Sequence, residues 1–367
     1  EFSETLVLTL TGTSNADLSG SNFVFTYKIT DDDVFGYTGP GGVGDSSSNI
    51  LWLDANEISA YSDNDDLLSW PDVSGNSNTF SESATFSPIY KTGVVNGYPV
   101  ARFNKTNNRI RNASFSGFAT SAITSIFVNS NNGESDEAQL SYASPTKNND
   151  FLLFNSNSLQ LFIEDSSLST GVNLNDNNWH ILDASWQSSD GAVSVWKDGG
   201  EVYSGNHQSG SLITDGGSLA LAGEQDSVDG GYLDSQAHKG DHPEVILYNV
   251  VLNDAQKIIV ANYLSAKYDI AISNDIYDQD DLSNGNFDHN VAGIGRAADG
   301  SFHIDSRGNG IIRMYDPNSV DINDFLFWGR DNTLDYTFAD NATYQSRISS
   351  KWRVTKQNDI GAVTVEV

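Results

Sequence analysis

The chain has no cysteine, few basic residues and no long apolar run. Since none of its 367 residues is a cysteine, disulfides, thiolate metal sites and thiol catalysis are excluded. Only 19 lysines and arginines stand against 49 aspartates and glutamates, so the formal net charge is −30. Nucleic-acid binding needs basic side chains at the phosphates, and we therefore expect no nucleic-acid partner. No apolar run approaches the roughly 20 residues that span a bilayer, so we expect no direct membrane insertion.

Hydrophobic and acidic residues define what the chain does have. Hydrophobic residues make up 38 % of the sequence, which is enough for a packed core and argues against intrinsic disorder. Aspartate and asparagine cluster with glycine and serine between the apolar runs. Short oxygen-bearing side chains in flexible turns are the ligands that Ca²⁺ requires, although a solvated acidic surface is the open alternative. We expect an extracellular protein that uses Ca²⁺ where others use disulfides.

The apolar pattern predicts an all-β fold. Short alternating or apolar runs, such as 123–128, 180–186 and 192–197, are separated by turn residues, which is typical of a sandwich or jelly roll. Asp190-Gly191 predicts a hairpin turn between two of these strands. One helix interrupts the pattern after Asn253, which forms a capping-box pattern with the glutamine three residues later.

Composition shifts divide the chain into four segments. We expect a strand hairpin in 1–33, a Gly-, Pro- and Ser-containing linker in 34–48, a jelly-roll β-sandwich with a short closing helix in 49–270, and a second β-rich domain in 271–367. Strand-like sequences at both ends suggest a fragment of a larger protein, with the last domain truncated. We expect the fragment to be a monomer.

Three stretches of sequence resemble known families. "NNWHILDASWQSSDGAVSVWKDGG" resembles the centre of the laminin G, pentraxin and concanavalin-like family, in which a W-H strand precedes a V-DG hairpin. "ETLVLTLTGTSNADLSGSNFVFTYKITDDD" resembles the last hairpin of a Calx-beta module. "DFLFWGRDN" and the strands around it resemble an uncharacterised module that follows concanavalin-like domains in surface proteins of marine bacteria. Together the resemblances imply a concanavalin-like sandwich on a bacterial cell surface.

Acidic clusters supply the candidate calcium ligands. The Calx-beta resemblance implies a site at the first cluster, and the spacing of oxygen side chains suggests two more, for which an Asx-turn and a solvated loop are the alternatives. The candidate metal ligands are Asp31, Asp32, Asp33, Asp63, Asp65, Asp72, Asn76, Asp275, Asp278 and Asp280.

The loop before the last sandwich strand supplies the candidate ligand-binding residues. Sugar recognition needs an aromatic plane and side chains that accept hydroxyl protons. The candidates are Asp226, Asp229, Tyr232, Asp234 and Asn249, with plain loop packing as the alternative. His238 and His242 have a spacing that suits zinc only on a helix, which Gly240 and Pro243 exclude.

Catalytic patterns are missing from the sequence. Glycoside hydrolases on this fold carry Glu-x-Asp-x-Glu on one strand, and no such pattern occurs. We therefore expect no enzyme but a calcium-dependent region of a bacterial cell-surface adhesin that binds an extracellular polysaccharide or glycoprotein. A structural, calcium-stiffened spacer is the alternative, and a polysaccharide-degrading enzyme is the interpretation that the residues favour least.

Overall fold

The computed structural model describes residues 3–9, 24–30, 37–104, 107–131, 137–333, 338–342 and 345–367. The chain forms two compact units, residues 1–35 and residues 36–367. In the first unit, β1 (Ser3–Thr9) pairs antiparallel with β2 (Val24–Thr30). This strand pair agrees with the predicted hairpin, whereas its membership of a Calx-beta module stays a prediction.

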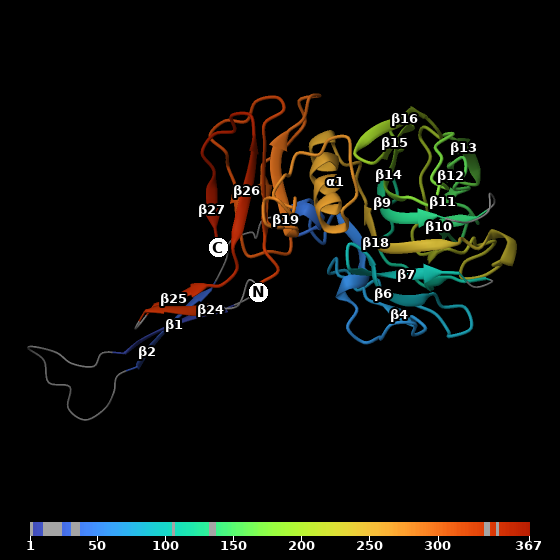
Figure 1. Ribbon diagram of the computed structural model, residues 1–367. Coiled ribbons are helices and arrows are strands. Elements are labelled where there is room, and N and C mark those ends of the chain that lie inside the picture. Colours follow the sequence, from blue (N-terminus) through green and yellow to red (C-terminus); the bar gives the residue numbers. More distant parts are fainter. Residues whose placement is uncertain are drawn as a thin grey trace, which may run out of the picture. The chain divides into compact units, whose positions relative to one another are not determined.

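Two eight-stranded antiparallel sheets form the sandwich of the second unit (Figure 1). The first sheet runs β16-β15-β14-β9-β18-β7-β6, and β3 also pairs with β18. Its strands are β3 (Asn49–Asp54), β6 (Ile89–Val95), β7 (Tyr98–Phe103), β9 (Ala122–Asn131), β14 (Trp179–Gln187), β15 (Ala192–Lys197), β16 (Gly200–Asn206) and β18 (Gly240–Tyr248).

The second sheet runs β13-β12-β11-β10-β17-β8-β5-β4. Its strands are β4 (Ser69–Trp70), β5 (Phe80–Ser81), β8 (Ile110–Asn112), β10 (Ala138–Ala143), β11 (Phe151–Phe154), β12 (Gln160–Ile163), β13 (Ser166–Ser169) and β17 (Ser218–Leu221). The predicted all-β sandwich is confirmed.

The central strands of the first sheet, β9, β14 and β18, are buried on both faces. In β18, Val245 and Leu247 point into the core between the sheets, while Ile246 and Tyr248 belong to a second core on the outer face. Successive side chains of a strand point to opposite faces, so a near-continuous apolar run is needed where both faces are covered.

Helix α1 (Asp254–Tyr268) covers that outer face, and its predicted capping box is present. Asn253 accepts from the backbone of Gln256, whose side chain accepts from the backbone of Asn253. Ile259 and Tyr263 are buried. The helix is buried almost all round and not on one face alone. Figure 1 shows the reason, since α1 lies between the sandwich and the C-terminal strands.

The C-terminal strands form three small sheets. Four strands run in the order β20-β19-β23-β26, three in the order β21-β22-β27, and β24 pairs with β25. They are β19 (His289–Arg296), β20 (Phe302–His303), β21 (Asp305–Ser306), β22 (Arg313–Tyr315), β23 (Phe325–Arg330), β24 (Phe338–Ala342), β25 (Gln345–Ile348), β26 (Trp352–Gln357) and β27 (Thr364–Glu366). The domain boundary near residue 270 stays a prediction, because the strands and the sandwich form one compact unit.

The segment predicted as a linker carries a buried turn. The 3-10 turn η1 (Pro40–Gly42) is fully buried, and its carbonyl groups accept from two side chains of the C-terminal strands. His303 Nε2 lies 2.8 Å from the Gly42 carbonyl oxygen, and Ser306 Oγ donates to that of Gly41.

Within the described residues, no helix is long and apolar enough to cross a bilayer.

Candidate functional site

In the predicted calcium turn, backbone amides occupy both carboxylate oxygens of Asp72. Asp72 Oδ1 accepts from the amides of Trp52 at 3.0 Å and Ser74 at 2.9 Å, and Oδ2 accepts from the amide of Asn78 at 2.8 Å. The side-chain amide of Asn76 donates to a carbonyl group of β3. The Asx-turn that the sequence left open as the alternative is therefore the arrangement present here.

Two further predicted ligands are also held by hydrogen bonds. Asp63 accepts from the amide of Thr92 and pairs with Lys91 at 2.9 Å. These contacts, the backbone amide first, lower the pKa of Asp63. Asp65 accepts from the amide of Ser62 at 2.7 Å. Both carboxylates stabilise a surface turn.

The acidic loop after α1 lines a cavity of about 390 Å³. Asp275 and Asp280 line it together with Asp269 and Asp281, while Asp278 accepts from the hydroxyl group of Thr355. Burial, reinforced by Asp275, raises the pKa of Asp280 to about 6. The structure thus brings two of the three predicted ligands of this cluster to one cavity.

The remaining metal candidates, Asp31, Asp32 and Asp33, lie outside the described residues. Within the part of the chain that the structure describes, no three histidine or carboxylate side chains are already arranged to hold a metal ion. Calcium binding at each predicted cluster therefore stays a prediction.

The loop 223–237 contains a carboxylate of a different kind. The loop begins after β17 of the second sheet and ends before β18 of the first sheet. Its two ends form the neck of the loop, where the His238 amide donates to the Ala222 carbonyl group at 3.0 Å. Glu224, two residues into the loop, is only 3 % exposed, and its Oε2 has no hydrogen-bond partner. Gln236, two residues before His238, has a buried Oε1 that is unpartnered as well. Two buried oxygens without hydrogen-bond partners, one on Glu224 and one on Gln236, thus lie two residues from the ends of the loop.

Burial governs the chemistry of Glu224. Loss of solvent, reinforced by the nearby carboxylate of Asp226, raises the pKa of Glu224 to about 7. A buried carboxylate without a partner is costly, and a cation or a proton relieves that cost. Carboxylate and amide oxygens are hard ligands that fit Ca²⁺, so Glu224 and Gln236 fit the ion.

Gln225 fixes the loop to both neighbouring strands. Its Nε2 donates to the carbonyl groups of Ser141 at 2.7 Å and Ser218 at 3.1 Å. Its Oε1 accepts from the Ser218 hydroxyl group, the Asp229 amide and the Tyr232 hydroxyl group. The loop is therefore held in shape without a ligand.

Asp229 and Tyr232, both predicted to bind ligand, anchor the loop instead. Asp229 pairs with Arg111, and the ring of Tyr232 lies 4.1 Å from the guanidinium of Arg109. Phe86 packs against the same guanidinium at 4.2 Å, so Arg109 is sandwiched between two rings. Such contacts hold the side chains in place and reduce their availability to a ligand.

The other three predicted ligand-binding residues are divided between two places. Asp226 and Asp234 are exposed on the loop. Asn249 follows the far end of β18, where it donates to the Ser47 carbonyl group. Since β18 is nine residues long, Asn249 lies about 30 Å from the loop. The structure does not bring Asn249 to the loop.

Sequence reasoning missed Glu224 and Gln236. A signal was present, because Glu-Gln-Asp follows the apolar segment 218–222 after a single glycine, Gly223. An acidic group at that point must either turn out to solvent or be buried.

Residues 120–284, which contain this loop, match the model of the pentaxin family. The neuronal pentraxin receptor of Mus musculus is 32 % identical over 133 residues, 35 % of this chain and 27 % of the relative. Neuronal pentraxin-2 of Homo sapiens is 30 % identical over 125 residues, 33 % of this chain and 29 % of the relative. The chain thus spans less than a third of the length of these curated relatives.

Solved structures give fold-level similarities. The native heptameric SAP-like pentraxin from Limulus polyphemus has a TM-score of 0.38 and 18 % identity, covering 43 % of this chain and 76 % of its own. Domain 4 of the arabinanase AbnA from Geobacillus stearothermophilus, in complex with arabinotriose, has a TM-score of 0.41 and 17 % identity, covering 58 % and 98 %. Within the sandwich, the helix and the loop after it, residues 120–284 are thus similar in sequence to the pentaxin family.

Proposed function

We propose that the sandwich is a calcium-dependent ligand-binding domain whose site is the loop 223–237. The observation that carries the proposal is the buried, unpartnered carboxylate oxygen of Glu224 within the region that matches the pentaxin family. Glu224, Asp226 and Gln236 would supply oxygen ligands to the ion. The bound ion would neutralise Glu224 and present a positive charge to an incoming ligand.

The ligand that suits this site is an extracellular polysaccharide or glycoprotein. Sugar hydroxyl groups can coordinate Ca²⁺ and also donate to exposed carboxylates such as Asp226 and Asp234. Because Gln225 already fixes the loop, little conformational freedom is lost when a ligand binds. We place this activity in a bacterial cell-surface adhesin, on the resemblance of the flanking segments to modules of such proteins.

A calcium-stiffened spacer is the second candidate function. The cavity of about 390 Å³ favours this function. Asp275 and Asp280 line it from the acidic loop, and Ala266 of α1 and Asp269, which caps the helix, line it from the helix end. A cation in that cavity would tie the helix to the loop that leads into the C-terminal strands.

A glycan array tests the proposal. The labelled chain is applied to marine and bacterial polysaccharides in millimolar Ca²⁺ and, separately, in chelator, beside the Glu224→Gln variant. We expect binding in Ca²⁺ that is lost both in chelator and in the variant. Binding that persists in chelator, or an unaltered variant, would contradict the proposal, and an empty array would favour the spacer.

A further inference from the structure

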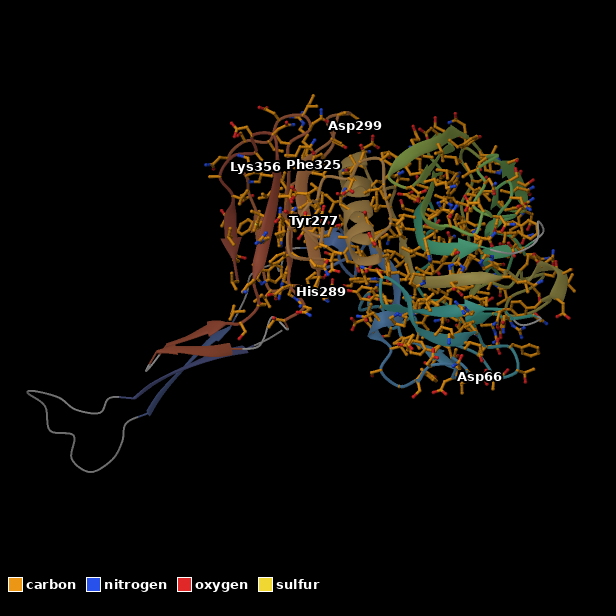
Figure 2. All side chains as sticks on the ribbon, in the orientation of Figure 1. Asp66, Tyr277, His289, Asp299, Phe325 and Lys356 are labelled. Carbon is orange, nitrogen blue, oxygen red and sulfur yellow. The ribbon has the colours of Figure 1, made fainter. Side chains whose placement is uncertain are left out.

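A larger cavity lies away from the loop, at the junction between the sandwich and the C-terminal strands. It measures about 620 Å³, within the range of small-molecule sites. Its walls come from β3 and the turn after it, β7, α1, β19 and the loop 307–310. Figure 2 labels His289, which lines the cavity from β19. None of the candidate metal ligands or ligand-binding residues predicted from the sequence lines this cavity.

The floor of the cavity is a buried charge network. The ammonium group of Lys267 lies 2.5 Å from Asp54, 2.7 Å from Glu244 and 3.1 Å from the Tyr263 hydroxyl group. Glu244 also accepts from the hydroxyl groups of Tyr263 and Tyr268. Since all three ammonium hydrogens have acceptors, the floor is rigid and offers no unpaired cation.

The charges around the cavity nearly cancel. Three lining carboxylates, from Asp54, Glu57 and Asp288, face three basic side chains, from Lys267, Arg307 and Arg330, and Glu244 in the floor adds one further carboxylate. The acidic cavity described above has four carboxylates and no basic side chain among its lining residues. A cation is therefore drawn to the smaller cavity, whereas the larger one favours neither sign of charge.

The walls offer hydrogen-bond acceptors and donors side by side. The carboxylates of Glu57 and Asp288 can accept hydrogen bonds. The hydroxyl group of Tyr98 can both donate and accept. Burial and the carboxylate of Asp288 raise the pKa of Tyr98 to about 12, so its hydroxyl group keeps its proton. The Tyr98 ring is fixed by an edge contact with Tyr268 at 5.6 Å and supplies an apolar wall.

We infer that this cavity is a second binding site, which takes an uncharged polyhydroxylated molecule of one or two sugar rings. Each hydroxyl group both donates and accepts, which matches a wall of carboxylates, guanidinium groups and a tyrosine. An anion or a cation would meet like charges on one side, and a fully apolar molecule would leave the polar walls unpaired. An occupant would touch the sandwich, the helix and the C-terminal strands at once.

This site differs from the proposed calcium site in one measurable way. The cavity contains no cluster of carboxylates free of basic neighbours, so binding there needs no Ca²⁺. Binding at the cavity therefore survives chelation, whereas binding at the loop 223–237 does not. Failure of either proposal leaves the other intact.

The test uses the full chain in chelator and, in parallel, in millimolar Ca²⁺. Isothermal titration calorimetry is carried out with the uncharged disaccharides cellobiose, lactose, maltose and trehalose, with choline as a cationic probe and with a uronic-acid disaccharide as an anionic probe. Glu57→Gln removes an exposed acceptor at the cavity, and Glu201→Gln, on exposed β16, is the matched control. We expect an uncharged disaccharide to bind, about tenfold more weakly to Glu57→Gln and equally to the control.

Each other outcome overturns the inference. Binding of no uncharged disaccharide, or of a charged probe alone, would show that the chemistry of the occupant is wrong. Equal binding to Glu57→Gln and the wild type would place the sugar elsewhere on the chain. Binding that appears only in Ca²⁺ would assign the sugar to the loop 223–237.

Discussion

Two loops of this chain combine acidic residues with glycine and serine and differ in structure. In the turn 72–78, both carboxylate oxygens of Asp72 are occupied by backbone amides. In the loop 223–237, Glu224 is buried with one oxygen that has no partner. The difference teaches that an acidic residue in a turn can have both oxygens occupied by backbone amides or keep one buried oxygen without a partner.

Free energy explains why both arrangements persist. A carboxylate that accepts several backbone amides stabilises the fold directly. A buried carboxylate without partners destabilises it until a cation or proton arrives. Asp72 therefore contributes to stability, whereas the loop that carries Glu224 is held in place by the hydrogen bonds of its neighbour Gln225.

The largest expected effect is that of Asp72→Ala. Three amides lose their acceptor, so we expect the free energy of unfolding to fall by about 3 kcal/mol. Urea unfolding with and without Ca²⁺ measures it, with Asp65→Ala, which frees a single amide, as the control. If the loss appeared only in Ca²⁺, Asp72 would be a calcium ligand and the contrast between the loops would fail.

Acid should weaken the side of the sandwich next to the loop 223–237. His238 closes the neck of the loop, and its ring centroid lies 4.9 Å from that of buried His242. Burial, reinforced by His238, lowers the pKa of His242 well below 6.5. The unfolded chain then takes up the proton first, so stability is present above pH 6.5 and falls as the pH drops below it.

The variant His242→Leu tests this pH dependence. Each buried histidine that stays neutral costs up to about 1.4 kcal/mol per pH unit below its unfolded pKa. We expect a shallower decline in the variant than in the wild type when urea unfolding is compared at about pH 7 and about pH 5. Parallel declines in the two proteins would show that His242 is protonated in the folded state.

Glu224→Gln should stabilise the chain in the absence of Ca²⁺. The variant removes a buried charge, and we expect a gain of about 1 kcal/mol. Because the folded pKa is raised from 4.5 to about 7, the wild type is relieved by protonation as the pH falls through that window. The gain should therefore be present above pH 7 and vanish near pH 4.5. A destabilised variant at high pH would mean that Glu224 has a stabilising partner.

Asp229→Asn should have the smallest effect. Its partner Arg111 is also paired with Glu82, and both side chains of the Asp229 pair are partly exposed. We expect a loss of about 0.5 kcal/mol in unfolding free energy and no change in calcium affinity. A large fall in calcium affinity would instead make Asp229 a calcium ligand, a role that the sequence analysis did not assign to it.

Local signals in the sequence predicted the fold well. The capping box at Asn253 and the turn at Asp190-Gly191 depend on neighbours a few residues apart, and both are present. The burial of α1 on all sides and of the turn 40–42 depends on distant strands, and no periodicity reveals such contacts. The sequence thus predicted the elements better than their packing.

The candidate site was harder to predict, for a related reason. Composition located the acidic turns, but whether an oxygen is free depends on which amides the fold brings to it. Trp52 lies 20 residues from Asp72 along the chain and still occupies one of its oxygens. Glu224 lacks such a donor, which only the assembled loop shows.

Calcium titration of the chelator-stripped chain tests the central claim most directly. Isothermal titration calorimetry compares the wild type with Glu224→Gln, and Glu201→Gln, at an exposed carboxylate on β16 outside every predicted cluster, serves as the surface control. We predict that Glu224→Gln loses one class of calcium sites, or weakens it by about tenfold or more, while the control matches the wild type. The same number of ions bound with the same affinity in all three proteins would contradict a calcium site at Glu224.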